Sequence, residues 1–354
     1  MPSADSFHDL VSGRRRGPLA ALARAGLWWA RLPYAVGVGV RNWRYDGGRR
    51  SARVPVPVVC VGNLTLGGTG KTPMVEYIAR FYRERDKAVA ILSRGYGTTG
   101  GANDEALVLE ENLPDVPHLQ GADRVAIANT AVEELESEVL VLDDGYQHRR
   151  LFRDLDIVLL DATRPIHKEY LFPRGLLRES VNGLKRAGFA VFTRCDQVPP
   201  ESLAEQRAWL TKRFPTLPQA TCVHQSVELL GADGATESVD LLNGKPVAGF
   251  CGVGNPESFR RTLTDLGATV VDFRAFPDHH PYTREDVDAL RAWAAKLPAD
   301  ATLATTQKDW VKLRVGELGG RPLWAVRVGV RFTSGEVELR AKLESVLPQL
   351  QEED

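Results

Sequence analysis

The stretch from Val56 to Ile78, VPVVCVGNLTLGGTGKTPMVEYI, limits the possible folds more than any other part of the chain. It runs from apolar, β-branched residues through a glycine-rich loop into an amphipathic segment. A strand, a loop and a helix in this order direct backbone N–H groups at anionic oxygens. The pattern G-x-x-x-x-G-K-[ST] is not fully met, because Thr65 takes its first glycine position. We still predict a phosphate-binding loop made of Gly67, Gly68, Thr69, Gly70, Lys71 and Thr72.

Short apolar runs alternate with helix-length segments after Val54. The runs are VPVVCVG, AVAILSR, EVLVLDD, LDIVLLDA and GFAVFTR. Continuous Val, Ile and Leu are typical of parallel strands that are covered on both faces. We therefore predict an α/β fold: a P-loop NTPase-like, doubly wound, mostly parallel sheet with a second, smaller α/β domain joined by a two-stranded hinge. Ligands are expected at the carboxyl ends of the strands.

A second α/β-like stretch begins at KPVAGFCGVGNPESF, Lys245 to Phe259. It is flanked by the extended runs ATCVHQSVEL and LWAVRVGVRF, which we expect to pair as the hinge. A last helix, around Glu336 to Leu350, is expected to return to the first module. The predicted domains are 1–50, a basic amphipathic membrane-surface segment; 51–218, the P-loop core; 219–332, the second α/β domain with the hinge strands; and 333–354, the C-terminal helix.

The composition is that of an ordinary folded protein, with 43% hydrophobic and 26% charged residues among 354. A net charge of −1 conceals a basic N-terminal part with ten Arg and three Asp up to Arg53. The four cysteines form no C-x-x-C pair, so neither a zinc site nor a disulfide framework is predicted, and a reducing cytoplasm fits best. No stretch reaches the ~18 apolar residues of a spanning helix, and the N-terminus lacks the order of a signal peptide.

The segment from Gly17 to Arg44 mixes Trp28, Trp29 and several leucines with four arginines. Indole rings and guanidinium groups at an apolar boundary are typical of helices that lie in lipid headgroups. The alternative is a helix packed on the protein's own core, with its arginines in water. The residues alone leave both possibilities open.

The motif EVLVLDDGYQH, Glu138 to His148, is an apolar run that ends in paired carboxylates. An Asp at a strand end across from a phosphate-binding loop is the arrangement that reaches a bound Mg²⁺. Either Asp143 or Asp144 is expected to serve the metal, together with the hydroxyl of Thr72.

Three further motifs carry polar groups. FTRCDQ, Phe192 to Gln197, resembles the base-recognition signature of GTPases with Arg194 in place of Lys, which keeps a GTPase open. FPDHHPYT places His279 and His280 on a loop, where one His could serve in acid–base chemistry, although a solvated loop is the commoner outcome. In LATTQKDWVKL, helix capping accounts for much of the pattern, and Lys308 could contact an anion.

The chain resembles the tetraacyldisaccharide 4'-kinase family, the lipid A 4'-kinases. The matching stretches include VPVVCVGNLTLGGTGKTP, ILSRGYG with NDEA, VLVLDDGYQHRRL, LFPRGLLRES, KPVAGFCGVGNPESF, FPDHHPYT and TTQKDWVKL. They run in family order from about Arg53 to Leu313 and cover most of the chain. GGTGKTP followed by DDGYQH is the specific part of this match.

The resemblance implies a kinase that uses ATP and Mg²⁺ to phosphorylate the 4'-hydroxyl of a tetraacyl disaccharide 1-phosphate in lipid A biosynthesis. It also implies peripheral attachment of the N-terminal segment to the anionic cytoplasmic face of the inner membrane. The expected partners are this lipid substrate and the membrane surface. We expect no nucleic acid and no obligate protein partner.

The family's catalytic base matches Asp104, assisted by the His of the Asp-His loop, which matches His279, with His280 still open. Lys71 is expected to neutralise charge on the transferring phosphoryl group. Asp104 falls in the first predicted module and His279 in the second, which implies that closure assembles the site. Candidates for substrate or supporting contacts are Gln147, His148, Arg178, Glu179, His280 and Lys308.

Two stretches depart from the family pattern. The segment Asn103-Asp104-Glu105-Ala106 lacks the flanking Gly and Pro, and PRGLLRES lacks two prolines around Arg178 and Glu179. A nucleotide-switch GTPase without a sugar substrate remains an alternative, as does a membrane-surface ATP-binding regulator without catalysis.

Overall fold

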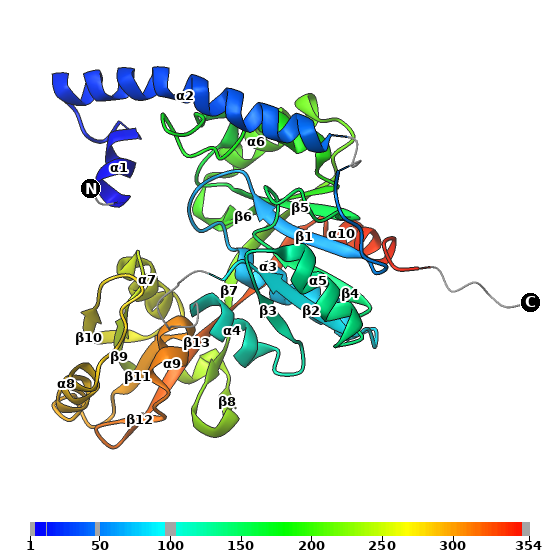
Figure 1. The fold of residues 1–354 in the computed structure, drawn as a ribbon. Coiled ribbons are helices and arrows are strands. Elements are labelled where there is room, and N and C mark those ends of the chain that lie inside the picture. Colours follow the sequence, from blue (N-terminus) through cyan, green and yellow to red (C-terminus); the bar gives the residue numbers. More distant parts are fainter. Residues whose placement is uncertain (1–3, 12, 47–49, 96–103, 349–354) are drawn as a thin grey trace, which may run out of the picture. The chain divides into compact units, whose positions relative to one another are not determined.

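The computed structural model describes residues 4–11, 13–46, 50–95 and 104–348 (Figure 1). The chain divides into two compact units. Unit 1 comprises residues 1–94, 119–223 and 331–354, and unit 2 comprises residues 95–118 and 224–330. The units differ from the predicted domains, because residues 95–118 cluster with unit 2, and residues 219–223 and 331–332 cluster with unit 1, together with the segments 1–50 and 333–354.

Helices and strands alternate along most of the chain. The α-helices are α1 (Ala4–Val11), α2 (Pro18–Tyr45), α3 (Lys71–Arg83), α4 (Asp104–Asn112), α5 (Arg124–Glu133), α6 (Pro200–Arg213), α7 (Pro256–Asp265), α8 (Arg284–Ala294), α9 (Gln307–Leu313) and α10 (Glu336–Glu344). The strands are β1 (Val58–Asn63), β2 (Val89–Ser93), β3 (His118–Gln120), β4 (Val139–Asp143), β5 (Leu155–Asp161), β6 (Phe189–Thr193), β7 (Gln219–Leu230), β8 (Thr236–Glu237), β9 (Pro246–Cys251), β10 (Thr269–Ala275), β11 (Thr302–Thr306), β12 (Glu317–Leu318) and β13 (Arg321–Ser334). Short 3₁₀ helices are η1 (Ile166–Lys168), η2 (Val181–Arg186), η3 (Cys195–Gln197), η4 (Ala232–Gly234) and η5 (Val239–Leu242).

The sheet of unit 1 has the strand order β7-β6-β5-β1-β4-β2-β3. The pairs of β1 with β4 and β5, of β2 with β4, and of β6 with β5 and β7 are parallel. Every residue of β1, β2, β4, β5 and β6 is buried, as expected for strands covered on both faces. These five strands coincide with the five apolar runs of the sequence, which confirms the predicted α/β class with a mostly parallel sheet.

Unit 2 has its own sheet segment, in the order β10-β9-β11-β13, with parallel pairing from β10 to β13. Its core is formed by two clusters, one around Phe250, Trp293 and Trp310, the other around Phe259 and Leu263. Val108 of α4 belongs to the first cluster, which explains why this helix, early in the sequence, is part of unit 2.

The two extended runs predicted to pair are β7 and β13, and they are hydrogen-bonded neighbours. Each strand contains the boundary between the two units, after Val223 in β7 and after Val330 in β13. Whether these strands act as a hinge stays a prediction.

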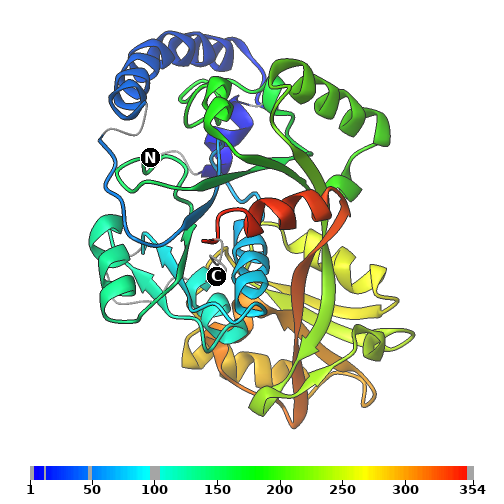
Figure 2. The same cartoon turned by 90° about the vertical axis from the view of Figure 1, so that its right-hand side faces the viewer.

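The C-terminal helix α10 packs on α3 within unit 1, and Figure 2 shows the two helices side by side. Tyr82 Oη donates to Leu343 O at 2.8 Å, and Tyr77 Oη donates to Glu336 Oε1 at 2.8 Å. The helix ends at Glu344, earlier than the predicted Leu350, because Pro348 cannot continue it. Leu350 itself lies outside the described residues.

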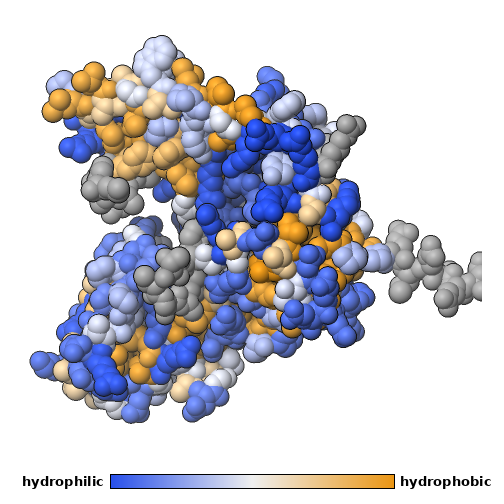
Figure 3. Space-filling view, in the orientation of Figure 1, coloured by the Kyte–Doolittle hydropathy of each residue, from blue (hydrophilic) through white to orange (hydrophobic). Residues whose placement is uncertain are grey.

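Most of the predicted membrane-surface segment forms helix α2, and this helix is exposed to solvent along most of its length. Ala20 is its buried residue, while Leu19, Trp29 and Trp43 are 82%, 66% and 74% exposed. Figure 3 shows hydrophobic residues gathered along this helix. No helix in the described part of the chain is long and apolar enough to cross a membrane.

Candidate active site

The predicted phosphate-binding loop lies in unit 1, between the end of β1 and the start of α3. Gly67 and Gly70 have φ values of 104° and 82°, a region that favours glycine, and Gly70 is the N-cap from which Lys71 starts the helix. Thr69 is fixed from two sides: its hydroxyl accepts from Asn63 Nδ2 at 3.0 Å, and its carbonyl accepts from Thr193 Oγ1 at 3.0 Å. The loop is therefore held open at a helix N-terminus, where phosphate oxygens bind.

Two cations meet the carboxylate of Asp144. Lys71 Nζ lies 3.6 Å from Asp144 Oδ1, and Arg178 Nη1 donates to both carboxylate oxygens at 3.0 Å. Asp144 follows β4 directly and has a φ of 49°, which turns its side chain away from the strand direction. The structure thus brings together Lys71, Asp144 and Arg178 from three separate motifs of the sequence.

The neighbouring Asp143 is the last residue of β4 and is 7% exposed, and Thr72 in the first turn of α3 is 8% exposed. In the described residues, no group of three or more His, Cys, Asp or Glu side chains could hold a metal by itself. A hydroxyl and one or two carboxylates fit Mg²⁺, which takes oxygen ligands and completes its shell with substrate phosphates and water. The donor set of Thr72, Asp143 and Asp144 is therefore compatible with Mg²⁺.

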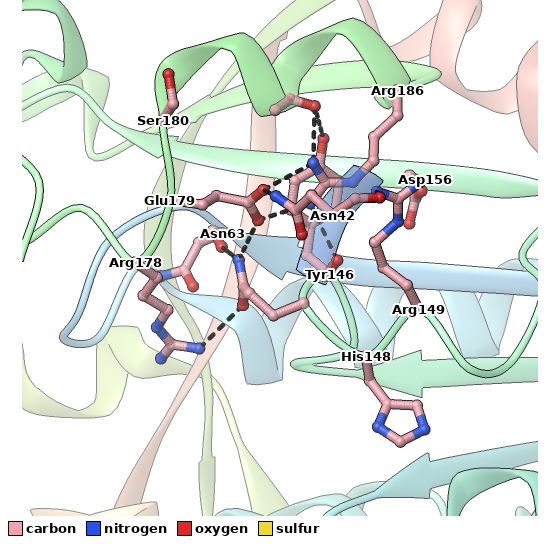
Figure 4. Close-up of polar contacts among 12 residues, drawn as sticks. Asn42, Asn63, Tyr146, His148, Arg149, Asp156, Arg178, Glu179, Ser180 and Arg186 are labelled. Atoms are coloured by element: carbon pink, nitrogen blue, oxygen red, sulfur yellow. Dashed lines mark hydrogen bonds and ion pairs between the residues drawn. The ribbon is translucent and has the colours of Figure 1, made fainter. Parts of the chain in front are cut away.

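Glu179 is fully buried and accepts four hydrogen bonds (Figure 4). Arg186 donates to its two oxygens at 2.6 and 2.8 Å, Gln147 Nε2 donates at 2.9 Å, and Asn42 Nδ2 of α2 donates at 2.9 Å. Burial raises the pKa of Glu179, but the hydrogen bonds and the charge of Arg186 outweigh it, so the pKa lies below its ordinary value. Glu179 therefore acts as an ionised anchor within unit 1.

Gln147 links this anchor to the phosphate-binding loop. Its Nε2 also donates to Asn63 O at 2.9 Å, and Asn63 in turn holds Thr69. Its Oε1 accepts from Arg178 Nη1 at 3.4 Å. A continuous chain of hydrogen bonds thus joins the loop, the DDGYQH segment and Glu179.

His148 lies among arginines and is half-buried. Burial, followed by the charges of Arg124, Arg150 and Arg153, lowers its pKa from 6.5 to about 4. The imidazole is therefore neutral at physiological pH, and the same arginines make its surroundings strongly positive.

The second group of predicted catalytic residues lies in unit 2. His279 Nδ1 lies 2.9 Å from Asp104 Oδ2, at hydrogen-bonding distance. Asp104 begins α4 and its side chain is 14% exposed, while that of His279 is 60% exposed. The Asp104 carboxylate is largely shielded from solvent, and the His279 imidazole is accessible. A carboxylate and an imidazole in contact are the groups expected of an acid–base pair.

The expectation that Asp104 and His279 belong to different modules is wrong, because both lie in unit 2. The reason is the packing of α4 on α9. The buried amides of Asn112 and Gln307 bond to each other at 2.6 and 3.4 Å, and Lys308 Nζ lies 3.4 Å from Glu105 Oε1. No movement between units is needed to form the pair. Asn103, where the family pattern was lost, lies outside the described residues.

The two adjacent histidines have different partners. His280 Nε2 lies 2.9 Å from Asp286 Oδ2, and its ring stacks on Phe276 at 4.9 Å. Asp286 also closes the capping box of α8 with Thr283. His280 is thus tied to the start of α8, and the geometry favours His279 as the partner of Asp104.

The motif that suggested a GTPase has a structural partner. Arg194 Nη1 lies 2.5 Å from Asp161 Oδ2 at the end of β5, and Arg194 itself has a φ of 56°. The arginine in place of the expected lysine therefore makes an ion pair between two strand ends.

Sequence reasoning missed three residues that organise these sites, Asn63, Arg186 and Lys312, and gave Asp309 a role in capping alone. Asn63 ends β1 and could have been noticed as a polar residue at a buried strand end. Asp309 was assigned to capping, which is correct in part, since its backbone N–H donates to Thr306 Oγ1. Nothing in the sequence marked Arg186 or Lys312. The partner of Arg186, Glu179, lies seven residues earlier in an irregular segment, and Asp104, which lies 3.3 Å from Lys312, is distant in the chain.

Fold and sites together define an α/β phosphotransferase that binds a nucleotide phosphate chain. The family model for tetraacyldisaccharide-1-P 4'-kinase, LpxK, matches residues 23–348. The chain is 39% identical to the tetraacyldisaccharide 4'-kinase of Anaeromyxobacter dehalogenans (strain 2CP-C), over 93% of this chain and 92% of that one. It is 35% identical to that of Geobacter sulfurreducens, over 96% and 98% of the two chains.

Among solved structures, LpxK from Aquifex aeolicus in complex with ATP superimposes with a TM-score of 0.75 and 31% identity, over 92% of this chain and 99% of that one. The chain belongs to the tetraacyldisaccharide 4'-kinase family. The predicted enzyme, a tetraacyldisaccharide 4'-kinase of lipid A biosynthesis, is confirmed, and the GTPase and regulator alternatives are set aside.

Proposed function

We propose that the enzyme transfers the γ-phosphoryl group of ATP to the 4'-hydroxyl of a tetraacyl disaccharide 1-phosphate, with Asp104 as the base. The observation that carries this proposal is the 2.9 Å contact between Asp104 Oδ2 and His279 Nδ1. A sugar hydroxyl is a poor nucleophile, and a positioned carboxylate can accept its proton as the new P–O bond forms and the bond to ADP breaks. His279 orients the carboxylate and shares the proton.

The groups of unit 1 are assigned to the nucleotide. Loop residues 67–70 and Lys71 hold the triphosphate through backbone N–H groups and one positive charge. Thr72 and Asp143 would hold a bound Mg²⁺, which would neutralise charge on the phosphate oxygens. Asp144 is assigned to orienting Lys71 and Arg178, since both cations already contact it. The core of unit 1 is accordingly proposed to be a P-loop NTPase-like, doubly wound fold.

The enzyme is further proposed to attach to the cytoplasmic face of the inner membrane through α2. Leu19, Leu22, Trp29, Val36 and Trp43 are exposed at spacings of three and seven residues, so they share a face of the helix. The arginines of α2 add attraction to anionic headgroups. Tyr34 Oη donates to Arg178 O at 2.8 Å, so the same helix is tied to the residue beside Glu179. The lipid substrate would then be met at the surface where it resides.

The decisive experiment measures transfer of γ-labelled phosphate from ATP to a tetraacyl disaccharide 1-phosphate in detergent micelles. Asp104→Asn is expected to lower kcat by roughly 10²–10⁴-fold, with the KM for ATP little changed, because the base acts on the acceptor. His279→Gln is expected to lower kcat as well. Asp300→Asn, an exposed carboxylate of the same unit, is the matched control. Near-normal turnover of folded Asp104→Asn would refute the proposal.

A further inference from the structure

The ammonium group of Lys312 lies between two carboxylates of unit 2. Its Nζ is 3.3 Å from Asp104 Oδ2 and 3.3 Å from Asp309 Oδ1, and its side chain is 11% exposed. The ring of Tyr282 lies on another side, with its centroid 5.4 Å from Nζ. We infer that Lys312, anchored by Asp309, is a positioning residue for the base Asp104. This inference rests on the proposed role of Asp104.

Asp309 is linked to both Asp104 and His279, in each case through one intermediate residue. It is fully buried, and its Oδ2 accepts from Gly252 N at 3.0 Å and from Thr306 Oγ1 at 2.6 Å. The carbonyl of Gly252 accepts from His279 N at 3.2 Å. One carboxylate therefore holds Lys312 through one oxygen and the loop of His279 through the other.

The backbone of His279 needs such support. His279 has a φ of 57°, a left-handed conformation that a residue with a side chain adopts at a cost. Gly252 is closely surrounded, because an added Cβ would lie 3.1 Å from both Asp309 Oδ1 and Pro277 O. The imidazole is thus presented to Asp104 by a tightly packed loop.

The contacts of Asp104 also restrict the rotation of its carboxylate. His279 Nδ1 lies 2.9 Å and Lys312 Nζ 3.3 Å from the same oxygen, Oδ2. Two neighbours at one oxygen favour a single orientation of the carboxylate.

The charged groups around Asp104 come from three elements. His279 and Asp278 lie on the loop after β10, and Asp278 Oδ2 is 4.0 Å from His279 Nε2. Helix α9 contributes Lys312, Asp309 and Lys308, the last paired with Glu105 of α4. His280 and Asp286 form a separate pair. Among the described residues, the Lys or Arg side chain in contact with the Asp104 carboxylate is Lys312.

A purely structural role for Lys312 in packing α4 on α9 is the competing explanation. These helices are also joined by the Asn112–Gln307 amides, and Val108, Trp310 and Val311 pack in one cluster. The two explanations differ in what Lys312→Met changes. A structural role affects stability alone, whereas a positioning role affects the alignment of Asp104 and therefore kcat.

The test compares the phosphate-transfer kinetics of Lys312→Met, Lys312→Arg and the parent. Lys312→Met is expected to lower kcat by about 10²-fold, with the KM values for ATP and for the lipid acceptor little changed, because the lost contact aligns the carboxylate and binds neither substrate. Lys312→Arg should restore part of the lost kcat. Lys296→Met, which removes an exposed ammonium of the same unit, is the control.

A second variant guards against misfolding, since Lys312→Met alone leaves Asp309 buried without its cation. The double variant Lys312→Met/Asp309→Asn removes both charges, and the amide oxygen can still accept from Gly252 N. The same loss of kcat is expected. A parental kcat in the folded double variant, with Asp104→Asn inactive, would overturn this inference alone. Full turnover of Asp104→Asn would overturn the proposed base and this inference together.

Discussion

Glu179 offers a direct test of how burial changes the value of an ion pair. Its bond to Arg186 Nη2 is 2.6 Å long, as is that of Glu344 to Arg85 Nη2 in the same unit. Glu179 is 0% exposed at its side chain, whereas Glu344 is 54% exposed. The shortest distance is therefore matched, whereas the solvent exposure and the number of donor residues differ.

Glu179→Gln is expected to lower the free energy of unfolding by about 3–5 kcal/mol, the cost of breaking one partner of a buried pair. Each oxygen of Glu179 accepts two of the four hydrogen bonds, so an amide nitrogen in place of one oxygen would face two donors. Arg186 keeps Tyr146 O as a partner but loses its counter-charge. Glu344→Gln should cost no more than about 1 kcal/mol.

The assay is urea unfolding by circular dichroism, with hydrogen exchange of peptides from β5 and β6 to report on unit 1. The difference between Glu179→Gln and the parent should also depend on pH. Because the folded pKa of Glu179 lies below its ordinary value of 4.5, its stabilisation is present above that value and is lost as pH falls through the folded pKa. Equal costs for Glu179→Gln and Glu344→Gln at pH 7 would refute the argument.

Three other outcomes follow from the described contacts. The double variant Trp29→Ser/Trp43→Ser should weaken binding to anionic vesicles by at least ~10-fold in a sedimentation assay, since both indoles are exposed. Its activity on micellar substrate should not fall. Unchanged vesicle binding would contradict the membrane role of α2. His148→Gln should reduce the loss of melting temperature between pH 7 and 5. The pKa of His148 in the folded protein is about 4, so the unfolded chain gains the proton first as pH falls below 6.5, and this destabilises the folded state. An unchanged pH dependence of the melting temperature would count against this reasoning. Gly252→Ala should lower kcat at least ~10-fold, because the added Cβ would displace the loop that carries His279. A parental kcat would contradict the predicted tight packing of this loop.

Local sequence determined the layout of the core. The apolar runs became β1, β2, β4, β5 and β6 because a fully buried parallel strand needs continuous apolar residues. The glycine-rich loop and the helix that follows it were also predictable, because the backbone conformation there depends on neighbours in the chain. The carboxylates after β4 were also placed by their position at a strand end.

Tertiary structure decided how distant segments combine. The sequence alone placed Asp104 in the first module, but α4 packs its Val108 into the core of unit 2, which brings Asp104 to His279 and Lys312. His279 and His280 could not be separated by sequence, because their different partners depend on the fold of the loop and the start of α8. The exposure of α2 likewise depends on what the rest of the chain leaves uncovered. Strands and loops follow local rules, whereas pairings across 175 residues, as between Asp104 and His279, depend on long-range packing that no local pattern records.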